Sequence, residues 1–326
     1  MNSASIKDIR EPIESYLKDF ETSFRNSMKS SVPLLDVIMN YLVSHKGKRM
    51  RPLFVFLSAG VCGNINDRTQ RTATMIELLH TATLIHDDVV DDSHKRRGFF
   101  SINALWKNKI AVLVGDYLLS RGLLLSLDNN DFDLLKIVSD ATREMSEGEL
   151  LQIEKARRLD ITEEIYFEII KKKTASLIAA CCKAGAVSVN APGDMPERMH
   201  AFGEYAGIAF QIKDDLFDYQ KNNSAGKPVG NDLKEKKMTL PLIYALNQTG
   251  FFEKQRIISA VRKKNAEPDT VNAVIEKVKN LEGISYATKK MFFYRDKALE
   301  ILKTFEPGAM TRSLEQLVHY TIERNK

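Results

Sequence analysis

One acidic pattern occurs twice in this chain. Residues 85–91 read IHDDVVD and residues 212–218 read IKDDLFD, so both segments fit I-x-D-D-x-x-D. Both lie in apolar sequence with helical spacing, and on a helix the aspartates four residues apart share one face. Two such faces turned toward each other would hold several hard divalent cations and, through them, a polyphosphate. The candidate metal ligands are Asp87, Asp88, Asp91, Asp214, Asp215 and Asp218.

Cationic side chains accompany both acidic boxes. The segment GKRMRP at 47–52 is a compact basic turn, and an Arg-Arg pair at 96–97 follows the first box. Lys227 and Lys237 follow the second box. Arginine suits bidentate phosphate binding, whereas lysine acts as a point charge. Alone, any one of these is an ordinary surface side chain; together they favour two anionic ligands, one bound through metals and one bound directly.

Further polar residues fall on the helices that carry or neighbour the boxes. His80 lies seven residues before Asp87, two turns away on the same stripe. Lys173 and Thr174 lie inside another helical segment, and Gln211 lies one turn before Asp215. If these side chains point into one cavity, they place dipoles and a positive charge beside a metal-bound phosphate.

Helix breakers are sparse, which predicts helix nearly throughout. No proline occurs between Pro52 and Pro192, and no run of alternating strands is found. Loops are expected at 44–51, 93–98, 190–197 and 219–237. No long or low-complexity linker divides the chain, so we predict one all-α domain over residues 1–326. The expected helices are 68–92, 110–127, 132–158, 162–189, 196–219, 239–246 and 286–305.

Composition excludes several protein classes. The 326 residues are 44% hydrophobic and 28% charged, which is typical of a folded globular protein. A net charge of +5 does not indicate nucleic acid, since anionic small substrates fit equally well. The three cysteines form no disulfide framework, which predicts a reducing, cytoplasmic location. The N-terminus has no signal-peptide core, and no stretch approaches the roughly 20 apolar residues of a membrane span.

These residues together resemble the trans-isoprenyl diphosphate synthase (polyprenyl synthetase) family. The resemblance runs from about Leu35 to the C-terminal YTIER, and its motifs occur in the family's order. They are GKRMRP, HTATLIHDDVVDDSHKRRG, GELLQ at 148–152, KTASL at 173–177, GIAFQIKDDLFDY and GKPVGNDLKEKKMTLPL. The resemblance implies a single large bundle of mostly antiparallel helices around a central deep cavity, usually a homodimer. Two departures, Lys46 in place of a glycine and Phe217 in place of an aliphatic residue, remove no catalytic group.

The resemblance also implies roles for individual residues. The two boxes would hold a cluster of Mg²⁺ ions on an allylic diphosphate. Thr174 and Gln211 would lie near the developing carbocation, with Gln152 as a supporting polar residue. The residues matching isopentenyl diphosphate binding are Lys48, Arg51, His80 and Arg97; those matching the allylic diphosphate are Arg96, Lys173, Lys227 and Lys237.

Product length depends on the residues below the first box. Ala82 and Thr83 precede its first aspartate by five and four residues, where relatives that make short products commonly carry a bulky aromatic. We therefore predict a medium- or long-chain polyprenyl diphosphate synthase, primed by farnesyl or geranylgeranyl diphosphate and supplying quinone side chains. Transient membrane contact would accompany release of so apolar a product. If a residue around 118–125 closes the tunnel early, the product is geranylgeranyl or farnesyl diphosphate instead.

Other functions fit less of the sequence. His86-Asp87 is a literal HD pair, as in HD-type metal phosphohydrolases, but the second box has no histidine beside it. Non-catalytic partner subunits of heteromeric prenyl synthases commonly lose one acidic box, whereas this chain keeps both. Terpene cyclases lack the basic cluster seen at Lys48 and Arg51.

Overall fold

The described part of the protein is almost entirely helical, apart from loops and one short β-hairpin. The computed structural model describes residues 5–45, 47–96, 98–158, 161–219, 230, 233, 235, 237–262 and 268–323. The α-helices are α1 (Ile6–Arg10), α2 (Glu14–Ser27), α3 (Pro33–Ser44), α4 (Met50–Cys62), α5 (Asp67–Val90), α6 (Ile102–Leu127), α7 (Phe132–Arg158), α8 (Glu163–Ile170), α9 (Ser176–Ser188), α10 (Met195–Phe217), α12 (Leu240–Asn247), α13 (Phe251–Arg262), α14 (Pro268–Asn280), α15 (Gly283–Leu302) and α16 (Ala309–Glu323). A 3₁₀ turn, η1, spans Glu11–Ile13, and a π-helical turn, η2, spans Lys171–Ala175.

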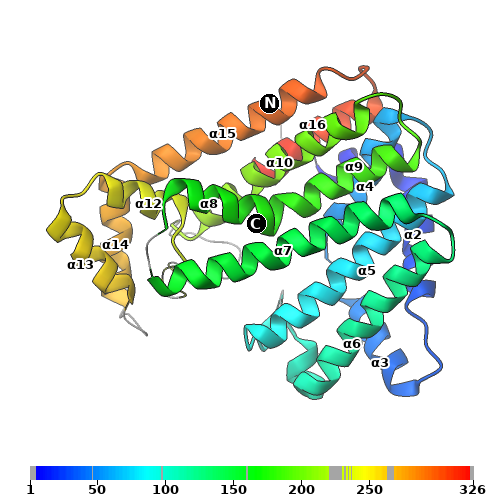
Figure 1. Ribbon diagram of the computed structural model, residues 1–326, viewed down its shortest axis with the longest axis horizontal. Helices are drawn as coiled ribbons and strands as arrows, with labels where there is room; N and C mark the ends of the chain where they lie inside the picture. Colours follow the sequence, from blue (N-terminus) through cyan, green and yellow to red (C-terminus); the bar gives the residue numbers. More distant parts are fainter. Residues whose placement is uncertain are drawn as a thin grey trace.

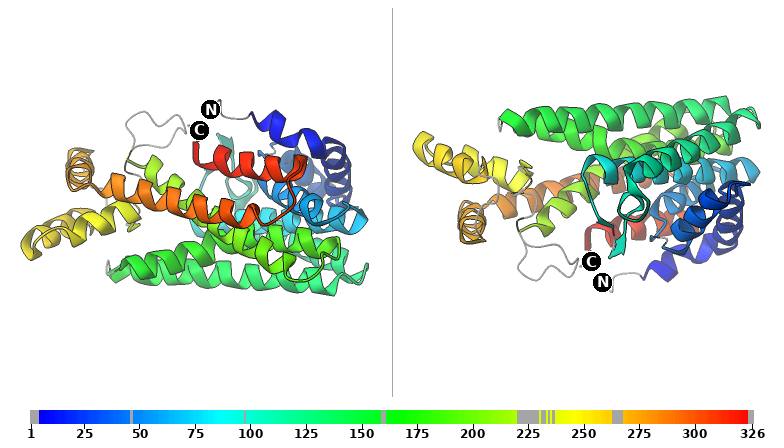
Figure 2. Two further views of the ribbon diagram at one scale, coloured as in Figure 1. Left: turned by 90° about the horizontal axis from the view of Figure 1, so that it is seen from above. Right: turned by 90° about the horizontal axis from the view of Figure 1, so that it is seen from below.

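Long helices run side by side along the long axis of the molecule (Figure 1). The most extensive packing joins α5 to α6, α10 to both α9 and α15, and α4 to α9. The shorter α12, α13 and α14 gather at one end, and α1–α4 lie at the other (Figures 1 and 2). The predicted all-α fold is confirmed, and the two acidic boxes lie at the C-terminal ends of α5 and α10.

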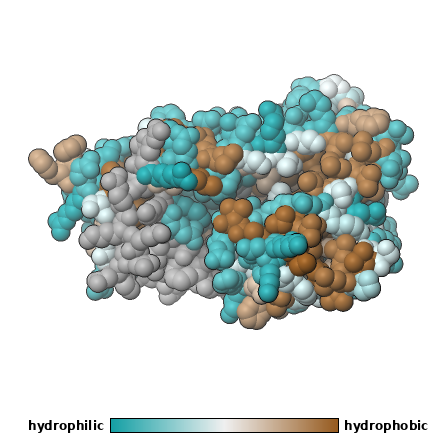
Figure 3. Space-filling view, turned by 60° about the horizontal axis from the view of Figure 1, so that its bottom comes forward, coloured by the Kyte–Doolittle hydropathy of each residue, from teal (hydrophilic) through white to brown (hydrophobic). Residues whose placement is uncertain are grey.

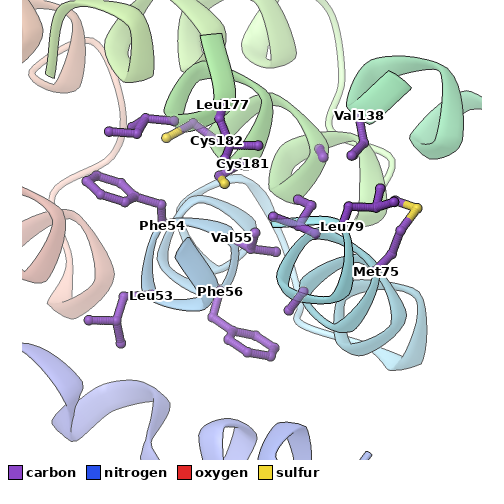
Figure 4. Close-up of a cluster of buried hydrophobic side chains, with 14 of the residues drawn as sticks. Leu53, Phe54, Val55, Phe56, Met75, Leu79, Val138, Leu177, Cys181 and Cys182 are labelled. Carbon is purple, nitrogen blue, oxygen red and sulfur yellow. The ribbon is translucent and has the colours of Figure 1, made fainter. Parts of the chain in front are cut away.

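Two clusters of buried apolar side chains form the core. One lies among α1–α7, α9 and the N-terminal half of α10, and Figure 4 shows its centre, where Val55 of α4 faces Cys181 of α9. The other lies among α8, the C-terminal half of α10 and α12–α15. Because α10 contributes to both clusters, its C-terminal end and the acidic box there have a fixed place between them.

The helix expected over 162–189 is interrupted where it passes the acidic boxes. The α-helix that begins at Glu163 ends after eight residues, and the π-helical turn η2 then separates α8 from α9. Glycines allow neighbouring helices to approach this turn closely. A Cβ atom on Gly148 of α7 would lie 2.8 Å from the backbone nitrogen of Lys173. A Cβ atom on Gly207 of α10 would lie 2.6 Å from the Cα atom of Ala175. Single π-helical turns inside helices occur frequently at functional sites.

The loop expected at 93–98 is a short β-hairpin instead. Lys95–Arg96 (β1) pairs antiparallel with Phe99–Phe100 (β2), and Gly98 has a φ of 84° in the connecting turn. Strands of two residues are too short to give an alternating pattern, which explains why the sequence did not indicate them. The hairpin matters because it brings Arg96 back onto the first acidic box.

Helix α6 is unusually apolar for its exposure. By length and composition alone it could cross a membrane, with a mean hydropathy of 1.6 over its most apolar 18 residues, although only 33% of them are buried. No such segment is expected from the sequence, because no stretch approaches roughly 20 apolar residues. A core helix of a folded protein meets the same criterion, and α6 packs along the whole of α5.

The three cysteine thiols are free and unreactive in character. Burial raises the pKa of Cys62 and of Cys181 to about 12, and it raises the pKa of Cys182 further. All three lie where α4 packs against α9.

Candidate active site

A cavity of about 840 Å³ lies between the two acidic boxes. Its walls come from α2–α5, the hairpin, the start of α6, α7, η2, α9, α10 and α16. Most of the residues predicted from the sequence meet there. These are Lys48, Arg51, His80, Thr83, Asp87, Asp88, Arg96, Lys173, Thr174, Gln211 and Asp214.

Other predicted residues lie elsewhere. Ala82 is buried in the core, and Gln152 reaches the cavity only through its contact with Lys173. Lys237 is paired with Glu235 at 2.6 Å. Arg97 and Lys227 fall outside the described residues.

The first box presents Asp87 to the cavity. Partial burial raises the pKa of its carboxyl group, and the negative charges of Glu149 and Asp91 raise it further, against the opposing effects of Lys173 and Arg96. Asp91 follows the last residue of α5 and is exposed. A bound cation would oppose these effects, because a nearby positive charge favours the ionised carboxyl group.

Asp88 is turned away from its neighbour and is neutralised by the hairpin. Its carboxylate is buried and accepts hydrogen bonds from Arg96, whose Nη2 lies 2.7 Å and whose Nε lies 2.9 Å from Oδ1. Asn103 of α6 donates to the Asp88 carbonyl oxygen at 3.1 Å. The first box is therefore held by one charged partner on a two-stranded hairpin.

The second box presents Asp214 to the cavity and turns Asp215 into the protein. Successive helical residues are rotated by about 100°. The Asp215 carboxylate is buried, accepting from the Tyr166 hydroxyl at 2.7 Å and from the Gln211 amide at 2.8 Å. Asp218 follows the end of α10 and is also buried, and its carbonyl oxygen accepts from the Gly230 nitrogen at 3.1 Å.

The π-helical turn brings two polar residues into the same space. Thr174 donates to the Gln211 side-chain oxygen at 2.7 Å. The Lys173 ammonium forms an ion pair with Glu149 and lies 3.4 Å from the Gln152 amide oxygen. Lys173 therefore stands between the two boxes with one acidic partner already in place.

The basic turn lines the opposite part of the cavity. The Lys48 ammonium lies 3.0 Å from the Tyr320 hydroxyl of α16, while Arg51 and His80 also face the cavity. Arg49 points away from Lys48, pairs with the buried Glu77 of α5 at 2.9 Å and lies 4.2 Å from the centre of the Phe24 ring. This anchor fixes the turn to α5 one helical turn before His80.

Four of these side chains were missed by sequence reasoning. Arg49 and Glu149 lie inside motifs that the sequence analysis quoted, so their place in those motifs was a usable signal. Tyr320 begins the quoted C-terminal segment YTIER, so it carried the same kind of signal. Tyr166 gave none, because a tyrosine in a helical apolar pattern is most often a core or surface residue. The partners of both tyrosine hydroxyls come from segments at least 49 residues away.

The donor set suits hard divalent cations completed by substrate oxygens. Across the described part of the chain, no three His, Cys, Asp or Glu side chains converge as a ready-made metal cage. Magnesium is commonly bound by one or two carboxylates together with waters and substrate phosphates. Asp87 and Asp214, on opposite walls of one cavity, fit that pattern.

His86 does not share the cavity with Asp87. Its ring packs against α6, with Nε2 3.2 Å from the Val112 carbonyl oxygen and 3.5 Å from Asp116. A Cβ atom on Gly115 would lie 2.1 Å from that nitrogen. His86 therefore has a packing role between α5 and α6. This position argues against an HD-type phosphohydrolase, which needs the histidine of the HD pair as a metal ligand.

Comparison with known proteins identifies the family and the fold. The model of the family described as "Polyprenyl synthetase" matches residues 32–278. The chain is 35% identical to an all-trans-nonaprenyl-diphosphate synthase (geranyl-diphosphate specific) of Rhodobacter capsulatus over 98% of both chains. A Caulobacter crescentus polyprenyl synthase, solved with calcium and isoprenyl diphosphate, superposes with a TM-score of 0.90 at 32% identity and full coverage of both chains.

A relative named for a shorter product is also similar. A geranylgeranyl pyrophosphate synthase from Bacteroides thetaiotaomicron superposes with a TM-score of 0.83 at 38% identity, over 98% of this chain and 99% of that one. Family membership and fold are therefore independent of product length. The chain belongs to the polyprenyl synthetase family of prenyltransferases.

Proposed function

We propose that this protein condenses isopentenyl diphosphate with an allylic diphosphate to give a longer all-trans polyprenyl diphosphate. The observation that carries the proposal is the single cavity in which two acidic helix ends face a basic turn. That cavity has room and charge for two anions, one held through cations at Asp87 and Asp214 and one held directly by Lys48 and Arg51. We include the whole chain, 1–326, in one polyprenyl synthetase domain.

The reaction needs no nucleophilic side chain. The allylic C–O bond breaks, and its electron pair leaves with the diphosphate. The isopentenyl double bond then attacks the allylic carbon to form the new C–C bond, and a proton passes from the adducted isopentenyl unit to a diphosphate oxygen, which restores an alkene. Bound Mg²⁺ would supply the Lewis acidity that stabilises the leaving diphosphate.

The chain's own residues hold and orient the reactants. Asp87 and Asp214 would bind the cations from opposite walls, with Asp88, Asp91, Asp215 and Asp218 completing or supporting the two boxes. Lys173, Arg96, Lys227 and Lys237 would act on the allylic diphosphate. On its arrival Lys173 would exchange Glu149 for phosphate, a stronger anionic partner. Thr174 and Gln211 would face the allylic cation.

Isopentenyl diphosphate would occupy the basic end of the cavity. Lys48, Arg51, His80 and Arg97 are its proposed ligands, and three of them line the cavity in the described structure. The Arg49–Glu77 pair keeps the basic turn docked on α5, with Lys48 and Arg51 in the cavity lining.

We propose that product length is set deeper than the positions directly below the box. On α5 the stripe from Asp87 passes Thr83, which lines the cavity, and reaches Leu79, which is buried against Gly122 of α6. Leu79 lies near Met75 and Val138 at this depth (Figure 4). A prenyl product that grows past the small Thr83 side chain would be stopped by the Leu79 side chain. Leu79→Ala should therefore lengthen the products, and Thr83→Phe should shorten them.

A product assay tests the reaction and the floor together. The purified chain would be incubated with labelled isopentenyl diphosphate, Mg²⁺ and each allylic primer in turn, and the dephosphorylated products sized. Products well beyond geranylgeranyl length would support a long-chain synthase serving quinone side chains. A stop at farnesyl or geranylgeranyl length would give the shorter-chain synthase. No incorporation from any primer would overturn catalysis by this chain alone.

We further propose that the chain forms a homodimer through α6. Apolar patches interrupt the polar surface on the face seen in Figure 3. Exposed apolar residues on α3, α6 and the start of α7 include Val37, Leu105, Val112, Leu113, Leu124, Leu127 and Phe132. A patch of this length on a helix that is only one-third buried in its most apolar part suits a second copy of itself, because a two-fold interface matches one surface to itself.

The oligomeric state decides this point. Leu113→Glu should convert a dimer to a monomer in light scattering, and Phe252→Glu, at an even more exposed site on α13, should not. A wild-type monomer that pellets with anionic vesicles would instead assign the patch to a membrane surface. The free thiols support the proposal of a reducing, cytoplasmic location.

A further inference from the structure

We propose that Tyr166 and Asp215 set the polarity of a hydrogen-bond chain that turns the Thr174 oxygen toward positive charge in the cavity. The chain runs from the Tyr166 hydroxyl to Asp215, from Asp215 to the Gln211 amide, and from Gln211 to Thr174. This inference rests on the proposed function, because it assigns a role in stabilising the allylic cation. Tyr166 becomes a positioning residue that acts through other groups and does not touch the substrate.

The donor and acceptor of each hydrogen bond between Asp215, Gln211 and Thr174 follow from the carboxylate of Asp215. An ionised carboxylate only accepts hydrogen bonds, so Asp215 must face the NH₂ group of Gln211. The amide oxygen of Gln211 then points the other way and must accept from the Thr174 hydroxyl, 2.7 Å away. Consequently the Thr174 proton is committed to Gln211, and its oxygen lone pairs are left for the cavity that Thr174 lines.

Burial makes this polarity stable. Asp215 and Tyr166 are 6% and 4% exposed, and their 2.7 Å contact joins α8 to α10 on the side away from the cavity. Hydrogen bonds in such surroundings polarise one another, so a negative charge at one end increases the negative character of the oxygen at the other. The Tyr166 hydroxyl holds Asp215 in the orientation that Gln211 requires.

The consequence for catalysis is differential stabilisation. An oxygen with its lone pairs aimed at a developing cation stabilises the transition state more than the neutral substrate. Removing the Tyr166 hydroxyl should therefore lower kcat with little change in the KM of either diphosphate. The second acidic box would in this way contribute one aspartate toward the cations, Asp214, and one aspartate to the electrostatics of the carbocation, Asp215.

A double-mutant cycle tests the relay. Tyr166→Phe should lower kcat about 10-fold, and in a Thr174→Val background it should cost less than about 2-fold, because the end of the chain is then missing. The matched control is Tyr286→Phe, since the Tyr286 hydroxyl donates to the Glu163 carboxylate at 2.8 Å and is absent from the cavity lining. It should leave kcat unchanged in both backgrounds.

A binding measurement supplies a readout without turnover. With Mg²⁺ and inorganic diphosphate present, calorimetry would compare an ammonium analogue of the prenyl cation with its uncharged carbon isostere. Tyr166→Phe should reduce the preference for the ammonium compound about 10-fold, whereas Tyr286→Phe should preserve it. If Tyr166→Phe fails to fold, Asp215→Asn provides a second comparison, because it removes one of the two acceptor oxygens and no longer imposes one orientation on the Gln211 amide.

The possible failures are distinguishable. An active wild-type enzyme with additive effects of Tyr166→Phe and Thr174→Val, or with an unchanged ammonium preference, would overturn the relay while leaving the prenyl transfer intact. A wild-type enzyme that forms no prenyl product would overturn the proposed function itself.

Discussion

The two acidic boxes share one sequence pattern but differ in how their middle aspartates are neutralised. Asp88 faces a guanidinium on a short hairpin, and the Arg96 side chain remains 38% exposed. Asp215 faces the Tyr166 hydroxyl of α8 and the Gln211 amide of α10, both within the helical bundle. The first box therefore has a charged, partly solvated partner on a separate segment, whereas the second box is fixed by neutral donors inside the bundle. Two copies of one motif can thus line a single cavity while differing in how firmly they are held: the first box can adjust with its hairpin, and the second is fixed within the bundle.

The largest expected effect comes from the first aspartate of each box, which lines the cavity in both cases. Asp87→Asn and Asp214→Asn should each lower kcat/KM by about 10³-fold, because each removes a charge from the cavity wall where cations would bind. Steady-state kinetics at saturating Mg²⁺ measures this. Asp128→Asn, an exposed position after α6, serves as control. Near-wild-type activity in either cavity variant would remove that wall from the metal site.

The middle aspartates should separate the two boxes in stability. Asp88→Asn leaves a cation that water can screen, so unfolding free energy should fall by less than about 1 kcal/mol. Asp215→Asn replaces one acceptor oxygen by an amide donor, which must face either the Tyr166 hydroxyl or the Gln211 amide in the interior, and it should cost about 1–2 kcal/mol. Urea unfolding of both variants measures the difference. Equal losses would mean that the two boxes are equally rigid.

A smaller effect concerns pH and the first box alone. Because the pKa of Asp87 is raised, the wild-type enzyme should lose activity on acidification at a higher pH than an ordinary carboxyl group would cause. Glu149→Gln removes one negative neighbour and frees Lys173, and both changes lower the pKa of Asp87. Activity of this variant should persist to lower pH in a kcat/KM profile. A profile with an unmoved acidic limb would exclude Asp87 as the titrating group.

Much of this site was predictable because its residues are spaced along single helices. The stripe from His80 to Asp87 and the second box need only helical periodicity, and the structure brings both to the cavity. Family membership and the all-α fold are confirmed. The roles of individual residues remain predictions.

Other features depend on pairs that sequence spacing cannot show. Tyr166 meets Asp215 across 49 residues, and Arg49 meets Glu77 across 28. The π-helical turn arises where Gly148 and Gly207 let two helices approach η2, and no propensity rule indicates it. Ala82 and Thr83 are adjacent, yet one is buried in the core and the other lines the cavity, which only the rotation of α5 in its packing decides.

The raised pKa values of the buried thiols at the α4–α9 junction make these cysteines probes of local opening. Alkylating reagents attack thiolates, so Cys181 and Cys182 should remain unlabelled in the native enzyme and react only when that junction opens. Their labelling rate would report how often α4 and α9 separate at this junction. Bound diphosphates should slow that rate, because ligands that bind only the folded form lower the population of open molecules.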